Sequence, residues 1–287
     1  MPEASVVIQE QDQRPPLPQQ REEISAAKGE WTAELWHFRE LLYFLAWRDV
    51  KVRYKQAAFG AAWAIIQPLF TMFIFTFFFG RMANIPSGGI PYPLFFYTTL
   101  VAWTYFASTL GQAGNSLVSN APLITKIYFP RILLPASSAL SSLLDFGVGS
   151  SFLVVMMLYY RIAPSWRIVF WPIAVLEMLI VTVGISMWFA ALNVRYRDIK
   201  HVIPFMIQLG LWVSPVLYPI SYLSPHWRPL LALNPLTAVM EGFRACLFPN
   251  RQVDWGFMAI SFGTSLIFFV IGALYFRKAE KTFADII

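Results

Sequence analysis

The chain has 287 residues, of which 57% are hydrophobic, 17% aromatic and only 13% charged, with a formal net charge of +6. Its mean hydropathy is +0.54, and residues 82–125 form an uncharged run of 44. A soluble core does not need such runs, whereas a bilayer core about 30 Å thick requires about 20 apolar residues for each crossing helix. The composition excludes an ordinary soluble domain and predicts an all-α polytopic membrane protein.

Residues 1–30 are polar and glutamine-rich, with three prolines close together. A segment of this composition buries too little apolar surface to fold, so we expect a disordered cytoplasmic tail and no cleavable signal peptide. The chain contains a single cysteine, Cys246, which excludes an internal disulfide.

Residues 31–48 predict an amphipathic helix. Leu35, Phe38, Leu42 and Leu45 recur at spacings of three and four, which place them on one helical face. Such a helix would lie in the inner membrane interface with its apolar face toward the acyl chains. The alternative is a helix packed on a soluble core, but the sequence offers no soluble domain to supply that core.

Four basic residues follow, namely Arg48, Lys51, Arg53 and Lys55. Near anionic headgroups each contributes about 1 kcal/mol to membrane binding, so the cluster could serve simply as an anchor on the inner face. We group residues 31–55 as an interface helix with a basic segment, and residues 56–287 as the transmembrane domain.

Six apolar runs are predicted to span the bilayer. A stretch rich in proline and glycine at residues 86–93 prevents the long uncharged run from forming two helices. The predicted spans are residues 60–79, 94–118, 132–160, 168–193, 202–217 and 255–276.

Lysine and arginine residues in the loops orient these spans, because they collect on the cytoplasmic side. With the amino terminus inside, sixteen of the 22 lie on the inner side and six on the outer side. Both termini are therefore expected in the cytoplasm. The net positive charge then reflects membrane topology, and binding of nucleic acid is not indicated.

A short helix is predicted between the second and third spans. Asn120 is a good N-cap and Pro122 suits the first turn, whereas Pro130 cannot continue a helix. About two helical turns should therefore project into the cytoplasm. Their exposed apolar side chains would be Leu123, Ile124, Ile127, Tyr128 and Phe129. Such a projection usually fits a groove in a partner protein, and a helix lying back on the membrane is the alternative.

The outer stretch at residues 215–249 contains six prolines, too many for a crossing helix, yet parts of it are strongly apolar. Asn234 and Pro235 mark the start of a helix that measures about 20 Å, too short to span. Glu241 and Arg244 form an i,i+3 pair on its polar side. We predict two short re-entrant helices that dip in from the outer face, with a flat interfacial helix as the competing interpretation.

Two carboxylates lie inside predicted spans, Asp145 and Glu177. Ionisable groups in a membrane are usually functional or paired, which leaves a proton-coupled secondary transporter as one candidate class. Asp145, however, lies on a stripe of small residues typical of a helix-packing face, so a structural role is favoured for it. The three histidines are scattered over both sides of the membrane, and neither a catalytic site nor a metal site is indicated.

Five motifs occur in order: R-D-V-K-V-R-Y-K-Q with G-A-A-W-A-I-I-Q-P, L-I-T-K-I-Y-F-P-R, N-V-R-Y-R-D-I, S-P-V-L-Y-P and L-N-P-L-T. In this order they resemble the transmembrane subunit of ABC exporters for polysaccharides and polyol phosphates. These are the Wzm-type permeases of O-antigen export and their capsule and teichoic-acid relatives. The resemblance covers residues 31–287. It implies a homodimer in the bacterial cytoplasmic (inner) membrane, two separate ABC ATPase subunits, and a lipid-linked polysaccharide as substrate.

The resemblance also implies roles for particular residues. Those that couple to the ATPase would be Leu123, Ile124, Lys126, Ile127, Tyr128, Phe129 and Arg131. Those that form the cytoplasmic gate, where a lipid-linked glycan enters, would be Arg48, Asp49, Lys51, Arg53, Tyr54 and Lys55. The interface helix would touch the same ATPase, and the short helices at residues 225–248 would line the outer exit.

A glycan path should be lined by aromatic rings and carry little charge, because sugars present flat C–H faces. Candidate path residues are Trp63, Phe70, Phe73, Phe77, Phe205, Trp212 and Tyr218, although most aromatics in membrane helices serve packing or the interface. None of the 15 glycines is followed by lysine, so the chain carries no phosphate-binding loop. We therefore expect no cofactor on this chain, with ATP and Mg bound by the partner ATPase.

Overall fold

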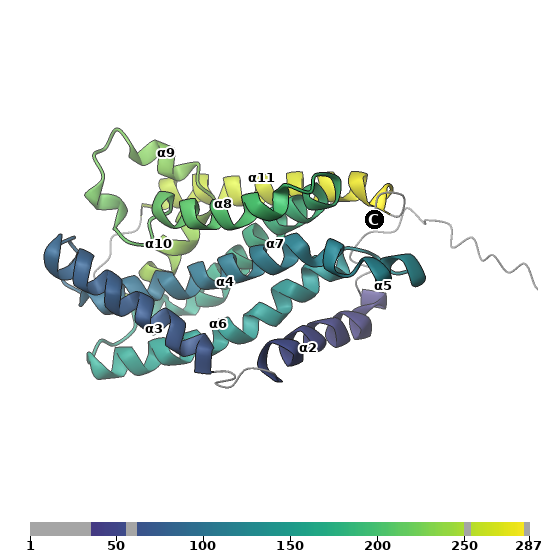
Figure 1. The fold of residues 1–287 in the computed structure, drawn as a ribbon. Helices are drawn as coiled ribbons and strands as arrows, with labels where there is room; N and C mark the ends of the chain where they lie inside the picture. Colours follow the sequence, from purple (N-terminus) through teal and green to yellow (C-terminus); the bar gives the residue numbers. More distant parts are fainter. Residues whose placement is uncertain (1–35, 56–61, 250–253, 284–287) are drawn as a thin grey trace, which may run out of the picture.

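The computed structural model describes residues 36–55, 62–249 and 254–283. In this part of the chain all regular elements are helical, and the long helices run roughly side by side, with α9 and α10 near one end and α5 near the other (Figure 1). The elements are α2 (Arg39–Lys55), α3 (Trp63–Phe75), η2 (Thr76–Met82), α4 (Tyr92–Ser119), α5 (Ala121–Lys126), α6 (Leu133–Tyr159), η3 (Trp166–Phe170), α7 (Trp171–Arg195), α8 (Ile199–Val213), η4 (Ile220–Tyr222), α9 (Arg228–Ala232), α10 (Leu236–Leu247) and α11 (Trp255–Glu280). The predicted disordered tail, residues 1–30, and residues 31–35 of the predicted interface helix lie outside the described residues.

Four helical segments are long and apolar enough to cross a membrane. They are Trp63–Met82, Leu133–Tyr159, Trp166–Arg195 and Trp255–Glu280. Within a few residues they coincide with the first, third, fourth and sixth predicted spans. These helices and the composition indicate a membrane protein.

α4, at the second predicted span, has 28 residues but carries many hydroxyl and amide side chains. It lies against α3, α6, α7, α8 and α10, in the middle of the bundle. Many of its polar groups bond within the protein: the Thr98 hydroxyl donates to the Leu94 carbonyl at 2.8 Å, and the Tyr105 hydroxyl to the Ala139 carbonyl at 3.3 Å. A helix that is surrounded by other helices needs fewer apolar side chains than one that faces lipid, and this explains the composition of α4.

α8, at the fifth predicted span, ends at Val213, whereas the sequence predicted residue 217. Its 15 residues measure about 22 Å at 1.5 Å per residue. Ser214 has an extended backbone, with ψ of 149°. The residue before a proline prefers this conformation, and Pro215 follows directly, so the predicted end was too late.

The segment before the first span forms one continuous helix, α2, which includes all four basic residues. The prediction that this helix ends near Arg48 was wrong, because neither glycine nor proline interrupts it before residue 55. α2 packs along α6. Its apolar stripe, expected to face acyl chains, packs on protein instead: Leu45 is buried, with Phe38 and Leu42 half-buried beside it.

α7 and α11 pack closely where two glycines meet. A Cβ built on Gly272 would lie 2.0 Å from the carbonyl oxygen of Gly184, and one built on Gly184 would lie 2.4 Å from the Cα of Phe269. Both contacts are with backbone, which cannot rotate away. Small residues at a crossing point are typical of packed membrane helices.

We expect Gly272→Ala to lower the thermal unfolding midpoint of the purified protein in detergent, since the added methyl meets the backbone of α7. Gly263→Ala is the matched control on the same helix, because a Cβ there has nothing within 4 Å. Replacing a helical glycine with alanine normally stabilises by about 0.5–1 kcal/mol, so the control midpoint should hold or rise. Equal losses in the two variants would contradict the close crossing.

Candidate functional site

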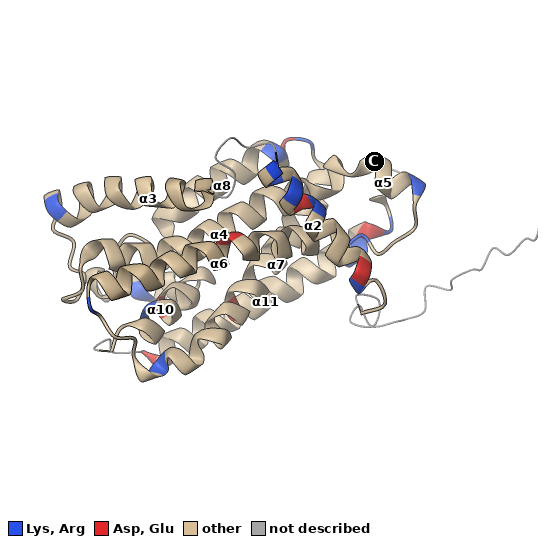
Figure 2. Ribbon diagram, turned by 90° about the horizontal axis from the view of Figure 1, so that it is seen from below, with Lys and Arg blue, Asp and Glu red and all other residues tan. Residues whose placement is uncertain are grey.

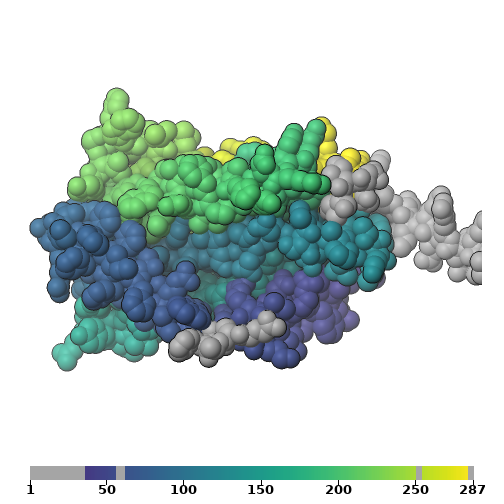
Figure 3. Space-filling model, in the orientation of Figure 1, coloured from purple at the N-terminus to yellow at the C-terminus, as the bar shows by residue number. Residues whose placement is uncertain are grey.

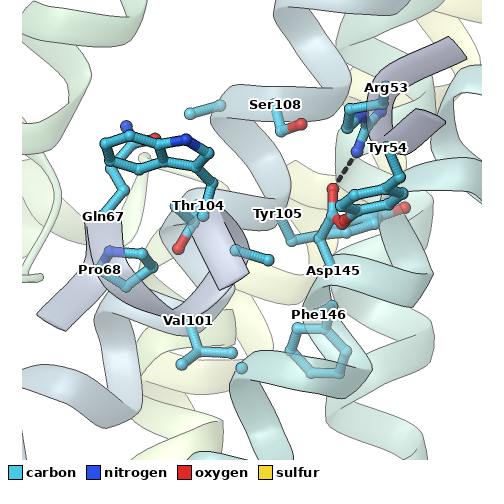
Figure 4. Close-up of a pocket in the computed structure, with 14 residues that line it drawn as sticks. Arg53, Tyr54, Gln67, Pro68, Val101, Thr104, Tyr105, Ser108, Asp145 and Phe146 are labelled. Atoms are coloured by element: carbon cyan, nitrogen blue, oxygen red, sulfur yellow. Dashed lines mark hydrogen bonds and ion pairs between the residues drawn. The ribbon is translucent and has the colours of Figure 1, made fainter. Parts of the chain in front are cut away.

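A cavity of about 480 Å³ lies between α2, α3, α4 and α6, within the size range of ligand pockets. Figure 4 shows Arg53 and Tyr54 of α2 beside Asp145 of α6, with Gln67 of α3 across the cavity. Its polar lining side chains are Arg53, Tyr54, Gln67, Thr104, Ser108 and Asp145. The fold therefore brings two predicted gate residues together with one of the two intramembrane carboxylates.

Arg53 and Asp145 form an ion pair in the wall of this cavity (Figure 4). The Arg53 guanidinium also donates to the side-chain oxygen of Gln112 and, at 3.5 Å, to the Ser141 hydroxyl. The Tyr54 hydroxyl donates to the other oxygen of Asp145. Both charged groups thus have several partners, as charges removed from bulk water require.

This pairing makes the wall electrically neutral, since the carboxylate of Asp145 compensates the guanidinium of Arg53. The serines that precede Asp145 on α6 are buried, among them Ser138, Ser141 and Ser142. The Ser142 hydroxyl lies 3.4 Å from that of Ser108 on α4, whereas Ser141 accepts from Arg53 of α2. The small-residue stripe is therefore a packing surface in the structure.

Arg48 lies on α2 about a turn and a half before Arg53. Its guanidinium donates to Asp49 at 2.8 and 3.1 Å and to the side-chain oxygen of Asn120 at 3.0 Å. Asp49 also accepts a hydrogen bond from Ser137 of α6 at 3.4 Å. The two lysines of the predicted gate, Lys51 and Lys55, are exposed.

Asn120 separates α4 from α5, but its side chain does not cap α5 as predicted. Its amide instead donates back to the Ser116 carbonyl at 2.7 Å. α5 ends at Lys126, after fewer turns than predicted, and Ile127 is already extended, with φ −130° and ψ 134°. A β-branched residue favours that conformation.

The predicted coupling segment lies at the end of the bundle that carries α2 and α5, where charged residues gather (Figure 2). Ile124 and Phe129, expected to be exposed, are buried in a cluster with Leu45 of α2 and with α11. Ile127 and Tyr128 are 57% and 75% exposed. The exposed apolar surface is therefore narrower than predicted and centred on these two residues.

The remaining residues of the predicted coupling set are Leu123, Lys126 and Arg131. Leu123 is half-buried and Lys126 is exposed. The backbone N–H of Arg131 donates to the carboxylate of Glu280 at 2.9 Å, and its guanidinium donates to the Glu280 carbonyl. The segment is thus attached to the carboxyl end of α11.

The predicted path aromatics come from α3, η2, α8 and the segment after α8, and α3 (blue) and α8 (green) are both visible on the face drawn in Figure 3. The exposed members are Trp63, Phe70, Phe73, Phe77, Phe205 and Trp212. The Trp212 ring lies 6.1 Å from that of Phe75 and 6.2 Å from that of Phe79, so it joins α8 to α3. Tyr218 is half-buried beyond α8 and donates to the Trp212 carbonyl at 3.2 Å.

At the opposite end, α10 carries Arg244, which was predicted on the polar side of the helix but is fully buried, at 0% exposure. It donates to Glu241 at 3.0 Å and to the carbonyls of Val216 and Tyr218 at 2.8 and 3.2 Å. Its guanidinium lies 3.9 Å from the centre of the Phe95 ring of α4. The residue therefore attaches α10 both to α4 and to the segment after α8.

Glu177 lies on α7 and is buried, and its Oε1 has no hydrogen-bond partner among the described residues. Asp145 lies on α6 beside α2. In the part of the chain that the structure describes, no hydrogen bond or ion pair links these two carboxylates. The structure thus does not bring them together as a proton relay would require.

These features define a helical membrane protein with a cavity between its helices and an exposed apolar pair, Ile127 and Tyr128, at its charged end. The chain belongs to the ABC-2 type transporter family, which it matches over residues 40–248. It is similar to the O-antigen export system permease protein RfbA of Myxococcus xanthus, with 28% identity over 88% of this chain and 97% of that protein. RfbA of Klebsiella pneumoniae is 31% identical over 86% of this chain and 95% of its own. The polysialic acid transport protein KpsM of Escherichia coli is 21% identical over 82% and 91%.

The predicted pair of Glu241 and Arg244 is present, at 3.0 Å. Sequence reasoning missed the contacts of Gln112 and Asn120, and those of Arg244 with backbone carbonyls. Both amide residues are uncharged: Gln112 lies within the second predicted span and Asn120 just after it. Neither therefore stands out in the sequence as a residue with distant partners. A signal for Arg244 was present in the proline-rich stretch at residues 215–219, because prolines cannot donate backbone hydrogen bonds and irregular carbonyls there need donors. A guanidinium with five N–H groups is well suited to supply them.

Replacing Arg244 with methionine should strongly destabilise the outer end of the protein. It removes donors from two carbonyls and the cation that pairs with Glu241, and losing one partner of a buried pair costs about 3–5 kcal/mol. Arg228→Met is the control at the same end, since Arg228 is half-buried and donates to the Leu223 and Ser221 carbonyls at 3.2 and 3.4 Å. Thermal unfolding in detergent should show a clearly larger loss for Arg244→Met, and similar midpoints would refute the anchoring role.

Proposed function

We propose that this chain is the permease subunit of an ATP-driven exporter that moves a lipid-linked, O-antigen-like polysaccharide across the bacterial cytoplasmic (inner) membrane. The observation that carries the proposal is the alignment of 86–88% of the chain with permeases named for O-antigen export. The relatives named for polysialic acid transport are more distant, which favours an O-antigen-like glycan over a polysialic-acid-like one. A permease for another amphiphile, such as teichoic acid, is the alternative.

ATP would be hydrolysed by a separate subunit. Two ABC ATPases, each with ATP and Mg, would bind beneath the permease, and the exposed pair Ile127 and Tyr128 would enter a groove on one of them. Exposed apolar side chains next to charged ones are what such an interface needs. The other predicted coupling residues would serve the same contact: Leu123 and Lys126 at its edge, and Ile124, Phe129 and Arg131 by fixing the segment to α2 and α11.

The proposed topology has six spans, with both termini in the cytoplasm. α4 and α8 would be the second and fifth, supported by the length of α4 and by the apolar sequence of α8. α2 would be the interface helix on the inner side, and α9 and α10 would be re-entrant helices on the outer side. The gathering of charges around α2 and α5 supports this orientation (Figure 2).

Two copies of the chain would enclose the glycan path. In the Trp63–Met82 segment only 6% of the apolar window is buried inside one copy, so this helix is available to a second copy, and twofold pairs are the commonest assembly. The path would follow the exposed rings of α3 and α8, where sugar faces can slide without breaking a strong bond. Tyr218 would lie at its outer end.

Glycan would enter beside α2. Lys51, Lys55 and Arg48 would attract the phosphates of a lipid carrier at the headgroup level, because cations near the surface bind phosphate oxygens. Arg53 and Tyr54 would form the polar wall of the cavity, held by Asp145, with Asp49 keeping Arg48 in place. Lys51 and Lys55 are assigned to the lipid carrier because they are exposed, and Arg53 to the cavity wall because it pairs with Asp145.

The ATP-driven mechanism is preferred over proton coupling. Membership of the ABC-2 type transporter family favours it. Asp145 already has Arg53 and Tyr54 as partners, and Glu177 lies on another helix.

Replacing both Ile127 and Tyr128 with aspartate should abolish copurification of the ATPase from detergent extracts while leaving the permease folded, since both side chains are exposed. Tyr196→Asp is the control: this aromatic is also exposed, after α7 on the same end, and it should leave the complex intact. A complex that survives the double change would refute docking at this segment.

Phe73→Ala should slow polymer export several-fold with dimer assembly unchanged, because the Phe73 ring is 72% exposed and would contact sugar in the path. Phe262→Ala removes another exposed ring on α11, which packs on α7, α9 and α10, and should export normally. Export is measured as surface polymer in intact cells. If Phe262→Ala slows export as much as Phe73→Ala does, the assigned path is wrong.

A further inference from the structure

We propose that α2 transmits the position of the predicted coupling segment (residues 123–131, called the docking segment below) to the wall of the 480 Å³ cavity. Asn120 would be the positioning residue where α2 meets the docking segment, and Asp145 the one where α2 meets the cavity wall. The inference rests on the proposed function, since it assumes an ATPase that moves the docking segment. It goes beyond that function by naming how the movement reaches the place where glycan enters.

The first contact lies where α2 meets the docking segment. Asn120 immediately precedes α5, so any displacement of α5 moves it. Its side-chain oxygen accepts a hydrogen bond from Arg48 at 3.0 Å, and its side-chain amide donates to Ser116 of α4 at 2.7 Å. One asparagine therefore connects α5, α4 and α2. Arg48 is further held by Asp49, at 2.8 Å.

The second contact lies at the carboxyl end of α2, in the cavity wall. Arg53 pairs with Asp145 of α6 and donates to Gln112 of α4, while Tyr54 donates to the same carboxylate (Figure 4). These α2 side chains line the cavity directly. A shift of this end of α2 therefore changes the shape of the cavity.

The helix between the two contacts is short and stiff. Arg48 and Arg53 are five residues apart, about 7.5 Å along the axis at 1.5 Å per residue, within an unbroken helix. Between them Asp49 accepts from Ser137 of α6 at 3.4 Å. Movement at one contact is therefore passed to the other with little loss, because the intervening backbone cannot bend without breaking its own hydrogen bonds.

The chemistry of both contacts suits a connection that has to hold one arrangement and then release it. A partly buried ion pair such as Arg53–Asp145 adds little net stability, because desolvation offsets its attraction. Its hydrogen bonds are directional, however, so they are lost in intermediate positions of the two helices. Apolar packing alone would let α2 slide along α6. The apolar side of α2 packs on the bundle through Leu45, whereas Tyr43, Phe44 and Trp47 on its outer side are exposed. The polar contacts add directionality to that apolar packing.

The first test uses the complete exporter with its ATPase. Asn120→Leu should leave ATPase copurification and ATP hydrolysis within about twofold of wild type. It should reduce surface polymer at least about tenfold, because Arg48 keeps Asp49 as an acceptor but loses its hydrogen bond to the junction of α4 and α5. Asn120→Asp restores an acceptor for Arg48 but not the donor to Ser116, and should export near the wild-type rate. Normal export by Asn120→Leu, or loss of the ATPase from it, would overturn the transmission role.

The second test exchanges the charges at the other contact. Arg53→Asp and Asp145→Arg should each stop export, and the double exchange should recover at least about a third of it, because the pair is rebuilt with its polarity reversed. Rescue by the double exchange, with ATPase copurification and ATP hydrolysis unchanged in the single variants, would show that the two charges act on export as a pair. If both single variants fold and assemble with the ATPase but the double exchange exports nothing, the contact does not act through pairing.

Failure of the proposed function would be seen separately, in the wild-type protein. A wild-type chain that binds no ATPase, or that exports polymer without ATP, would remove the premise before any variant is compared. A wild-type chain that passes both measurements leaves the variants as a test of α2 alone.

Discussion

Polar groups carried into the interior of this bundle need partners within the protein, because lipid offers none. α4 meets that requirement for much of the structure. It is surrounded by five other helices, and both deeply placed arginines reach it: Arg53 through Gln112, and Arg244 through Thr99 at 3.3 Å. The inner cavity and the outer short helices are therefore attached to the same central helix.

This arrangement divides the molecule into a packed part and an open part. α4 packs on α6, α7 and α10, and α11 packs on α7 and α10. The α7–α11 crossing allows only glycine at its centre. α3 contributes few buried residues, and α8 has a largely exposed outer side. A rigid group of helices thus carries two helices whose aromatic side chains remain available for assembly or substrate.

The helical class and four of the predicted spans could be predicted from the sequence, because long uncharged runs permit few alternatives. The ends of elements were less predictable. α2 continued past Arg48 because nothing breaks it, and α5 stopped early at a β-branched residue. Burial was hardest to predict: Ile124 and Phe129 looked exposed within a cytoplasmic loop, yet α2 and α11, distant in sequence, cover them.

The sequence indicated which residues belong to the candidate site, but not which of them form pairs. The basic residues at 48–55 and the carboxylate at 145 are both evident in the sequence, but 91 residues separate Tyr54 from Asp145. The serines near Asp145 are buried, whereas Asp145 itself lines the cavity. Its pairing with Arg53 and Tyr54 depends on α2 lying along α6, which no local pattern indicates.

As the proposed second span, α4 is made by the ribosome before the helices that cover it. Its threonines, glutamine and asparagine would meet lipid while only α3 is present, and α3 shelters one side. The helix would therefore remain marginally inserted until α6 and α7 are synthesised and close around it. Defects in the packing surface of α6 would then act first during biosynthesis, by exposing a half-inserted chain to membrane proteases, before transport could be affected.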